Sequence, residues 1–398
     1  MQQVFSGVDI VTAWCFTGIA AVMAVAVTVF YTLRVAKVCK TVKAQSSSSF
    51  PEELPSVSVI VYSNGDASGL ATLLRQLREQ SYQAPWEVIV VNDGKDYETD
   101  MLLMSVASQW SLLRHTFTPK VMRNVSRKKL ALTLGMKAAR HDVVVHVTSS
   151  SRIKSPDWLK YMAMPFNNPS IDLVIGYACP DPADDTRRGS RRRAHDMLVT
   201  SVHYLASALT AHTYRGDGDN LAYRRDKFFE MKGFSNSLNL HYGDDDIFVS
   251  DVATPSNTAV MIARDAQVMT STPHPVEVYK AKKYRYDYTA RYCDCSQNWL
   301  YDTVSLLMWL WLLSTVGAVL IAFDNWLVMS VLGVVALLLW LPQMLVWRKA
   351  SLLLSSRRFM LSVPGSMLWR PFYNFIYHLR SRRIHTAHFT WQAIGNQQ

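Results

Sequence analysis

Three long runs without a charged residue constrain this 398-residue chain more than any other feature. They cover residues 11–33, 304–323 and 326–347. Each has at least 20 residues, and about 20 helical residues cross the hydrocarbon core of a bilayer. The first run is longer than a signal-peptide core and its charges follow it, which favours a retained anchor over a cleaved signal. We therefore predict three transmembrane helices, the last two joined by a very short external turn.

Basic residues gather on one side of these runs. Arg34, Lys37, Lys40 and Lys43 follow the first run, and eight further basic residues follow the third, with no acidic residue after Asp324. The positive-inside rule then predicts that the central domain and the tail lie in the cytoplasm. We expect an integral, multi-pass protein of a bacterial-type inner membrane. These twelve charges account for the net charge of +11. We therefore attribute the basic excess to topology and anionic lipid, and not to nucleic-acid binding.

The runs divide the chain into segments. The predicted order is a short external N-terminus at 1–10, a span at 11–33, a basic and serine-rich linker at 34–55, a cytosolic domain at 56–300, spans at 304–323 and 326–347, and a basic, aromatic tail at 348–398. No part of the tail is apolar for long enough to cross a bilayer, so we expect it to lie at the membrane interface.

Short β-rich runs alternate with helical runs in the central domain. Strands are predicted at 57–62, 86–91, 112–117 and 143–147, and helices at 70–80 and 127–140. Strands that are almost continuously Val and Ile, in this order, indicate an α/β, Rossmann-like fold with a mostly parallel sheet flanked by helices. Ligands bind beyond the carboxyl ends of such strands. Asn64, Asp93 and Ser149 to Ser151 follow strand ends and are therefore candidate site residues.

Four segments of the domain, taken in order, resemble the membrane-bound glycosyltransferases of family 2. They are Glu87 to Gly94, Ser126 to Ala139, Gly216 to Arg225, and Gly243 to Phe248. The resemblance covers roughly residues 56–292 and implies a GT-A fold. It also implies inverting transfer of a sugar from a nucleotide-sugar donor to a lipid-linked or growing glycan acceptor at the cytoplasmic membrane face, as in polysaccharide biosynthesis.

The resemblance assigns roles to individual residues. It places the donor on Asp93, Asn64, Lys129, Ser149, Ser151 and Arg152, and the acceptor or transferred sugar on Gly216, Gly218, Asn220 and Asp246. Asp245 is the expected catalytic base, with Asp244 beside it. A carboxylate can take the proton of a hydroxyl within hydrogen-bond reach, and crowded carboxylates raise one another's pKa toward neutrality.

The segment after the fourth strand departs from the family. Ser149 and Ser151 stand where the family has two aspartates that hold Mg²⁺ or Mn²⁺, and a serine hydroxyl is a poor ligand for either ion. Asp66 is the nearest replacement for the carboxylate usual after the first strand. We therefore predict a metal-independent donor site, since basic side chains can neutralise a diphosphate. The candidates are Arg152, Lys282, Lys283 and Arg285, although the basic run at 279–286 could instead anchor the domain at the membrane.

The serines also keep a second function open. A degenerate family member that no longer transfers sugar could serve as a binding or scaffolding partner in glycan assembly. Loss of both metal aspartates favours that interpretation. Retention of Asp93, the Gly216 to Asn220 stretch and the run Asp244 to Asp246 favours the enzyme.

Overall fold

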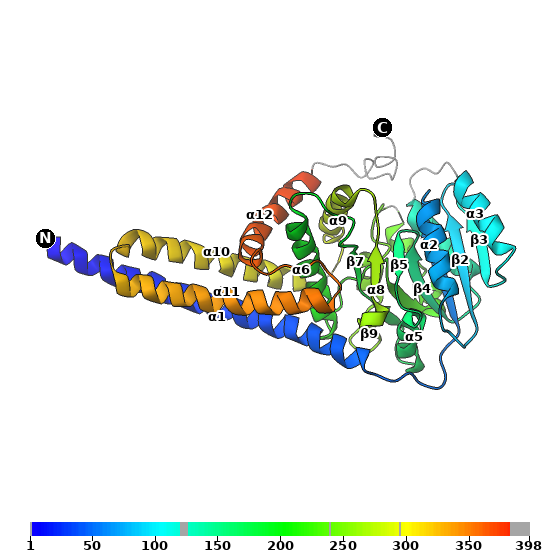
Figure 1. The fold of residues 1–398 in the computed structure, drawn as a ribbon, viewed down its shortest axis with the longest axis horizontal. Helices are drawn as coiled ribbons and strands as arrows, with labels where there is room; N and C mark the ends of the chain where they lie inside the picture. The colour runs from blue at the N-terminus through cyan, green and yellow to red at the C-terminus, as the bar shows by residue number, and fades with distance from the viewer. Residues whose placement is uncertain (1, 120–125, 239, 294–295, 383–398) are drawn as a thin grey trace.

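The structure, a computed structural model, describes residues 2–119, 126–238, 240–293 and 296–382. It combines an α/β domain with a rod of long helices that projects from one side (Figure 1). Residues 383–398 of the predicted tail lie outside the described residues. The mostly parallel sheet and the three candidate membrane helices confirm the predicted fold class.

The central sheet has seven strands in the order β3-β2-β1-β4-β8-β6-β9. Its strands are β1 (Val57–Ser63), β2 (Trp86–Asn92), β3 (Leu113–Phe117), β4 (Val143–Thr148), β6 (Leu173–Ile175), β8 (Leu221–Arg224) and β9 (Thr258–Val260). Strands β3, β2, β1 and β4 run parallel, whereas β8 is antiparallel to both of its neighbours. The start of β8 therefore lies at the same sheet edge as the ends of β1, β2 and β4.

A second sheet has three short strands in the order β5-β10-β7. They are β5 (Ser151–Ile153), β7 (Ala178–Pro180) and β10 (Val268–Thr270). The pairing of β5 with β10 begins at Ser151, directly after the turn that follows β4. This small sheet therefore fixes the segment that holds the two serines.

Helices cover both faces of the large sheet. Those of the domain are α2 (Ala67–Arg78), α3 (Tyr97–Ala107), α4 (Arg127–Ala138), α5 (Trp158–Ala163), α6 (Ser190–Ala208), α7 (Arg225–Glu230), α8 (Asp246–Val252) and α9 (Pro275–Thr289), with short 3₁₀ turns at Met164–Asn167, Ser235–Ser237 and Arg264–Ala266. Strands β1, β2 and β4 place alternate residues in two cores: Val57, Val59 and Val61 face the core that contains α2, whereas Ile60 and Tyr62 face the core that contains α4 and α6.

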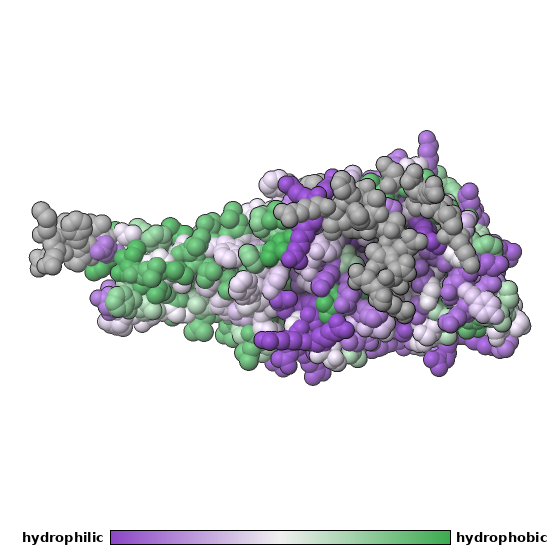
Figure 2. All heavy atoms as spheres, turned by 90° about the horizontal axis from the view of Figure 1, so that it is seen from above, coloured by the Kyte–Doolittle hydropathy of each residue, from purple (hydrophilic) through white to green (hydrophobic). Residues whose placement is uncertain are grey.

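Within the described residues, three helices are long and apolar enough to cross a membrane: α1 (Gln2–Ser46), α10 (Ser296–Ala322) and α11 (Trp326–Leu353). Helix α1 packs along both α10 and α11. Its 45 residues extend about 68 Å at 1.5 Å per residue, roughly twice the thickness of a hydrocarbon core. Hydrophobic residues cover this rod, and hydrophilic residues cover most of the domain (Figure 2).

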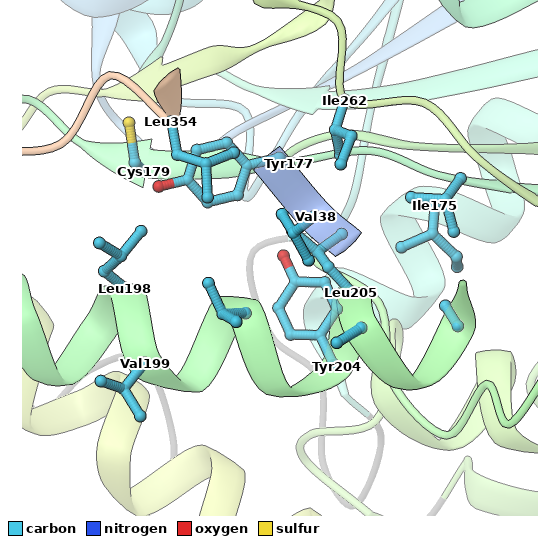
Figure 3. Packing of buried hydrophobic residues seen from close by; sticks show 14 of the residues in the cluster. Val38, Ile175, Tyr177, Cys179, Leu198, Val199, Tyr204, Leu205, Ile262 and Leu354 are labelled. Atoms are coloured by element: carbon cyan, nitrogen blue, oxygen red, sulfur yellow. The ribbon is translucent and has the colours of Figure 1, made fainter. Parts of the chain in front are cut away.

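The prediction of a linker over 34–55 is wrong in its first part, because α1 continues to Ser46. Val35, Val38 and Val42 are fully buried, and Figure 3 shows Val38 beside Ile262 and Leu205 of α6. The Gln45 side chain donates to the carbonyl of Val260 and accepts from the amide of Ile262. The C-terminal end of α1 is thus part of the domain core.

Helix α12 (Val363–Ser381) lies where the rod meets the domain, near α6 and α9 (Figure 1). Arg370 donates to Asp196 of α6 at 2.8 Å, and His378 contacts Asp287 of α9 at 2.9 Å. Its exposed large side chains are Trp369, Phe372, Phe375 and Leu379. They recur every three or four residues and therefore form one apolar face that points away from the domain.

Candidate active site

Polar segments from five parts of the chain meet at one edge of the large sheet. The ends of β1 and β2 are joined by the hydrogen bond from Asp93 N to Ser63 O, and those of β1 and β4 by the bond from Ser149 N to Tyr62 O. The loop before β8 reaches the segment before α8, because Gly218 N donates to Asp245 Oδ2 at 3.1 Å. This is the edge at which α/β sheets bind ligands.

Asp93 is buried at the end of β2, and three side chains hold it. Tyr62 donates to Oδ2 at 2.8 Å, Thr118 donates to Oδ1 at 2.5 Å, and the Arg127 guanidinium pairs with Oδ1 at 2.9 Å. Burial, aided by the Asp93 charge, raises the pKa of Tyr62 well above its ordinary value, so its hydroxyl keeps its proton and donates. The structure thus holds Asp93 rigidly in place.

The two polar residues after β1 have different environments. Asn64 is exposed at the strand end, open to a ligand. Asp66 caps helix α2 by accepting the amide of Gly69 at 2.8 Å. Asp66 is therefore committed to a helix end, and the suggestion that it replaces a missing site carboxylate is not supported.

The loop after β4 is organised by its own hydroxyls. Ser149 and Ser151 are both buried, and Ser151 Oγ accepts the amide of Thr148 at 3.1 Å. Thr148 Oγ1 donates to Asp219 Oδ1, also at 3.1 Å. The Arg152 guanidinium donates to the carbonyls of Ser149 and Ser151 at 3.2 and 2.9 Å, so it braces the loop.

This loop does not fit a divalent cation. The two side chains that the resemblance places at the metal are serines, and Ser151 already has a backbone partner. Mg²⁺ and Mn²⁺ prefer carboxylate, carbonyl and water oxygens. Across the described part of the chain, no group of three or more His, Cys, Asp or Glu side chains could hold a metal ion.

The loop before β8 contains both structural and polar residues. Asn220 is fully buried; its amide donates to the carbonyls of Tyr177 and Ala266 and accepts from the Trp158 indole. Gly216 packs closely against Val249 and Leu221. Asn220 and Gly216 therefore support the loop from within, whereas the prediction assigned them to the sugar. Gly218, by contrast, lies against Asp245.

The carboxylates of Asp244, Asp245 and Asp246 are buried, and each pairs with a cation. Asp244 pairs with Lys128 at 2.6 Å and with Arg285 at 3.2 Å. Arg285 also pairs with Asp245. Asp246 pairs with Arg215 at 3.3 Å and accepts the Thr289 hydroxyl at 2.7 Å.

The three environments separate the pKa values of the outer two carboxyls. Burial alone would raise the pKa of Asp244, but Arg285 and Lys128 hold it below its ordinary value. Burial, aided by the negative charge of Asp245, raises the pKa of Asp246 to about 7, and the positive charge of Arg215 opposes this rise. Asp244 is therefore a weak base, and Asp246 is a carboxyl that exchanges its proton near neutral pH.

The basic residues of the run at 279–286 lie on different faces of helix α9. Lys282 pairs with Asp217 at 2.7 Å, and Arg285 contacts Asp244 and Asp245, so both face the site. Lys283 pairs instead with Asp196 at 3.0 Å and donates to Asn374 of α12. Its assignment to a donor diphosphate is not supported by its position.

Lys129 is also occupied by contacts within the protein. It is fully buried, and its ammonium donates to Ser237 O, Ser237 Oγ and Leu240 O. Arg127 and Lys128, which the sequence reasoning missed, reach Asp93 and Asp244 from the first turn of α4. Ser126 caps this helix, and that start signal could have indicated that first-turn residues reach the strand ends.

Comparison with known proteins gives a family match and similar folds. Residues 56–231 match the sequence model of the family described as Glycosyl transferase family 2. A mannosyltransferase from Pyrobaculum calidifontis, solved with GDP-Man and Mn²⁺, aligns with a TM-score of 0.55 and 15% identity over 90% of this chain and 99% of that one. At this identity the match shows a shared fold alone, and the shared α/β domain is GT-A-like.

A second similar structure is glucosyl-3-phosphoglycerate synthase from Mycobacterium tuberculosis, solved with Mn²⁺, UDP and glucosyl-3-phosphoglycerate. It has a TM-score of 0.40 and 14% identity, over 64% of this chain and 84% of that one. No curated protein sequence matches the chain.

Proposed function

Because residues 56–231 belong to glycosyl transferase family 2, we propose that this chain transfers a sugar from a nucleotide-sugar donor to a lipid-linked or growing glycan acceptor, with inversion, at the cytoplasmic face of the membrane. The observation that carries the proposal is the meeting of Asp93, the Thr148 to Ser151 loop and Asp245 at one sheet edge. Asn64 and Asp93 serve the donor side, and Asp245 serves the acceptor side.

Asp245 is the best base of the three neighbouring aspartates. Asp246 is tied to Arg215 and Thr289, and Asp244 is paired with two cations. Asp245 pairs with Arg285 and accepts the amides of Gly218 and Asp246, so its carboxylate contacts the loop before β8. Asp245 takes the acceptor hydroxyl proton while the acceptor oxygen bonds to the sugar carbon and the bond to the nucleoside diphosphate breaks. A single displacement of this kind inverts the sugar carbon.

The position of the site relative to the membrane supports a lipid-linked acceptor. Helix α9 contacts the catalytic carboxylates on one side and α12 on the other. The exposed apolar face of α12, at Trp369, Phe372, Phe375 and Leu379, is of the kind that lies in the headgroup region of a bilayer. The site is thus one helix away from the proposed membrane surface. Basic residues at the C-terminal ends of α1 and α11 support a cytoplasmic location of the domain.

The test uses the full-length protein in liposomes, radiolabelled nucleotide-sugars and a bacterial lipid extract. Asp245→Asn should reduce turnover by about 10²–10⁴-fold, the usual contribution of a general base, with nucleotide affinity unchanged. Asp226→Asn, at a side chain that is 91% exposed on α7, is the matched control and should retain activity. Folded wild-type protein that neither binds nucleotides nor transfers sugar would refute the enzyme and favour a scaffolding role.

A further inference from the structure

With two serines after β4, the site can lack a divalent cation without a change in its net charge. In the family pattern, two aspartates bring two negative charges and a divalent cation brings two positive ones. With Ser149 and Ser151 in their places, both carboxylates and the need for the cation disappear together. The net charge that a donor diphosphate meets is then the same. A divalent ion bound here would have no carboxylate ligand from Ser149 or Ser151 to balance its charge.

The carboxylates around this loop already have cationic partners from the chain itself. Lys282 pairs with Asp217, Lys128 and Arg285 pair with Asp244, and Arg127 pairs with Asp93. Asp219 accepts the Thr148 hydroxyl. Asp245 shares Arg285 with Asp244, so these five carboxylates face four cations and most of their charge is balanced before a donor binds.

Lys282 is the cation connected to the serine loop. Its ammonium donates to Asp217 Oδ2 at 2.7 Å, Asp217 Oδ1 accepts the amide of Asp219, and Asp219 accepts Thr148 Oγ1. The Lys282 side chain is 16% exposed, so it is not fully enclosed by the protein. An ammonium has three donors, which leaves capacity for an anion beside Asp217.

The other candidate cations have different tasks. Arg152 donates to the carbonyls of its own loop, and Lys283 pairs with Asp196 on the far side of α9. Arg285 lies on Asp244 and Asp245. Burial alone would lower the pKa of Lys282, but Asp217 and Asp219 raise it above its ordinary value. The ammonium therefore stays charged over the working range of pH.

We propose that Lys282, together with the hydroxyls of the Thr148 to Ser151 loop, binds the diphosphate of the donor in place of a divalent cation. This inference rests on the proposed function. When the bond between the sugar carbon and the diphosphate oxygen breaks, the electron pair stays on that oxygen, and the Lys282 ammonium stabilises it by a charge-assisted hydrogen bond. Lys282 loses no proton in the step, because the acceptor proton goes to Asp245.

Calorimetric binding of UDP and GDP to full-length protein in detergent tests the inference, in EDTA and in Mn²⁺. The wild type should bind one of them with the same Kd, within twofold, in both conditions. Lys282→Met should weaken that binding at least tenfold in EDTA. Lys280→Met, an equal change at an exposed position of the same helix, should leave the Kd within twofold. Because Lys282→Met leaves Asp217 unpaired, Lys282→Met/Asp217→Asn repeats the measurement without a buried lone charge.

A gain of metal dependence is the converse test. Ser149→Asp/Ser151→Asp should weaken nucleotide binding at least tenfold in EDTA, and Mn²⁺ should restore it. Wild-type binding that requires Mn²⁺, or a Kd unaffected by both Lys282 variants, would overturn the inference and leave the glycosyltransferase proposal intact. Failure of the folded wild type to bind either nucleotide in either condition would instead overturn the proposed function.

Discussion

Replacing His146 tests the electrostatics beneath the site through the pH dependence of stability. His146 lies on β4, two residues before the Thr148 to Ser151 loop, and stacks on Tyr223 with ring centroids 4.8 Å apart. Neither ring nitrogen has a hydrogen-bond partner among the described residues. Burial, aided by the charge of Lys128, lowers the pKa of His146 from 6.5 to about 3. The ring is therefore neutral in the folded protein.

The direction of the effect follows from these two pKa values. As the pH falls below 6.5, the unfolded chain binds a proton at His146 before the folded chain does. The stability that depends on a neutral ring is thus complete above pH 6.5 and is lost as the pH falls toward 3. Each pKa unit corresponds to about 1.4 kcal/mol, so at pH 5 the loss from this residue alone is about 2 kcal/mol.

The assay is urea denaturation of the detergent-solubilised protein at pH 7.5 and pH 5.0, followed by tryptophan fluorescence. His146→Phe keeps an aromatic ring against Tyr223 and removes the titration. The free energy of unfolding of the wild type should fall by about 2 kcal/mol more than that of His146→Phe between the two pH values. His115→Phe, on the exposed side of edge strand β3, should behave as the wild type. Equal pH dependence of the wild type and His146→Phe would show that His146 is not buried as a neutral ring.

Three further predictions concern packing and the membrane. Asp196→Ala removes the partner of Arg370, Lys283 and Tyr279, and the buried cations left behind should lower the free energy of unfolding by about 3–5 kcal/mol; an unchanged urea midpoint would contradict this burial. Gly176→Ala would place a methyl group 2.4 Å from the carbonyl oxygen of Asn220, so it should lower the free energy of unfolding by at least about 3 kcal/mol, the upper end of the usual overpacking range. Gly333→Ala, with nothing within 4 Å, should leave the free energy of unfolding unchanged. In liposomes, a nitroxide at Phe375→Cys should be accessible to oxygen and protected from a water-soluble nickel complex. A nitroxide at Tyr97→Cys, on α3, should show the reverse. Equal accessibility at the two positions would place α12 in water.

The sequence predicted the elements whose signal is local. Runs of 20 apolar residues have few alternatives to a membrane helix, and the Val-rich strands β1, β2 and β4 were found within one residue of their ends. The signal for the continuation of α1 was also present, because Val35, Val38 and Val42 recur at helical spacing. The serines that follow them suggested a linker, but the domain surface against which these valines pack cannot be inferred from local sequence.

Elements that depend on distant partners were not predictable in the same way. Strand β5 has three residues, and it exists because Ser151 to Ile153 pair with β10, more than 100 positions later. Asn220 shows the same limit at the site. Its place in a glycine-rich stretch suggested contact with a sugar, but the structure uses its amide to join Tyr177, Ala266 and Trp158.

Helix α9 shows why neighbouring residues in one motif acquire separate roles. Successive residues of a helix point about 100° apart, so positions three or four apart share a face. Lys282, Arg285 and Thr289 share one face and contact Asp217, Asp244 and Asp246, whereas Tyr279, Lys283 and Asp287 share another and contact Asp196 and His378. One helix diameter, about 10 Å, therefore separates the carboxylates of Asp244 and Asp246 from α12. Helix α9 thus contacts α12 through Lys283 and Asp287 and also holds Arg285 against Asp245.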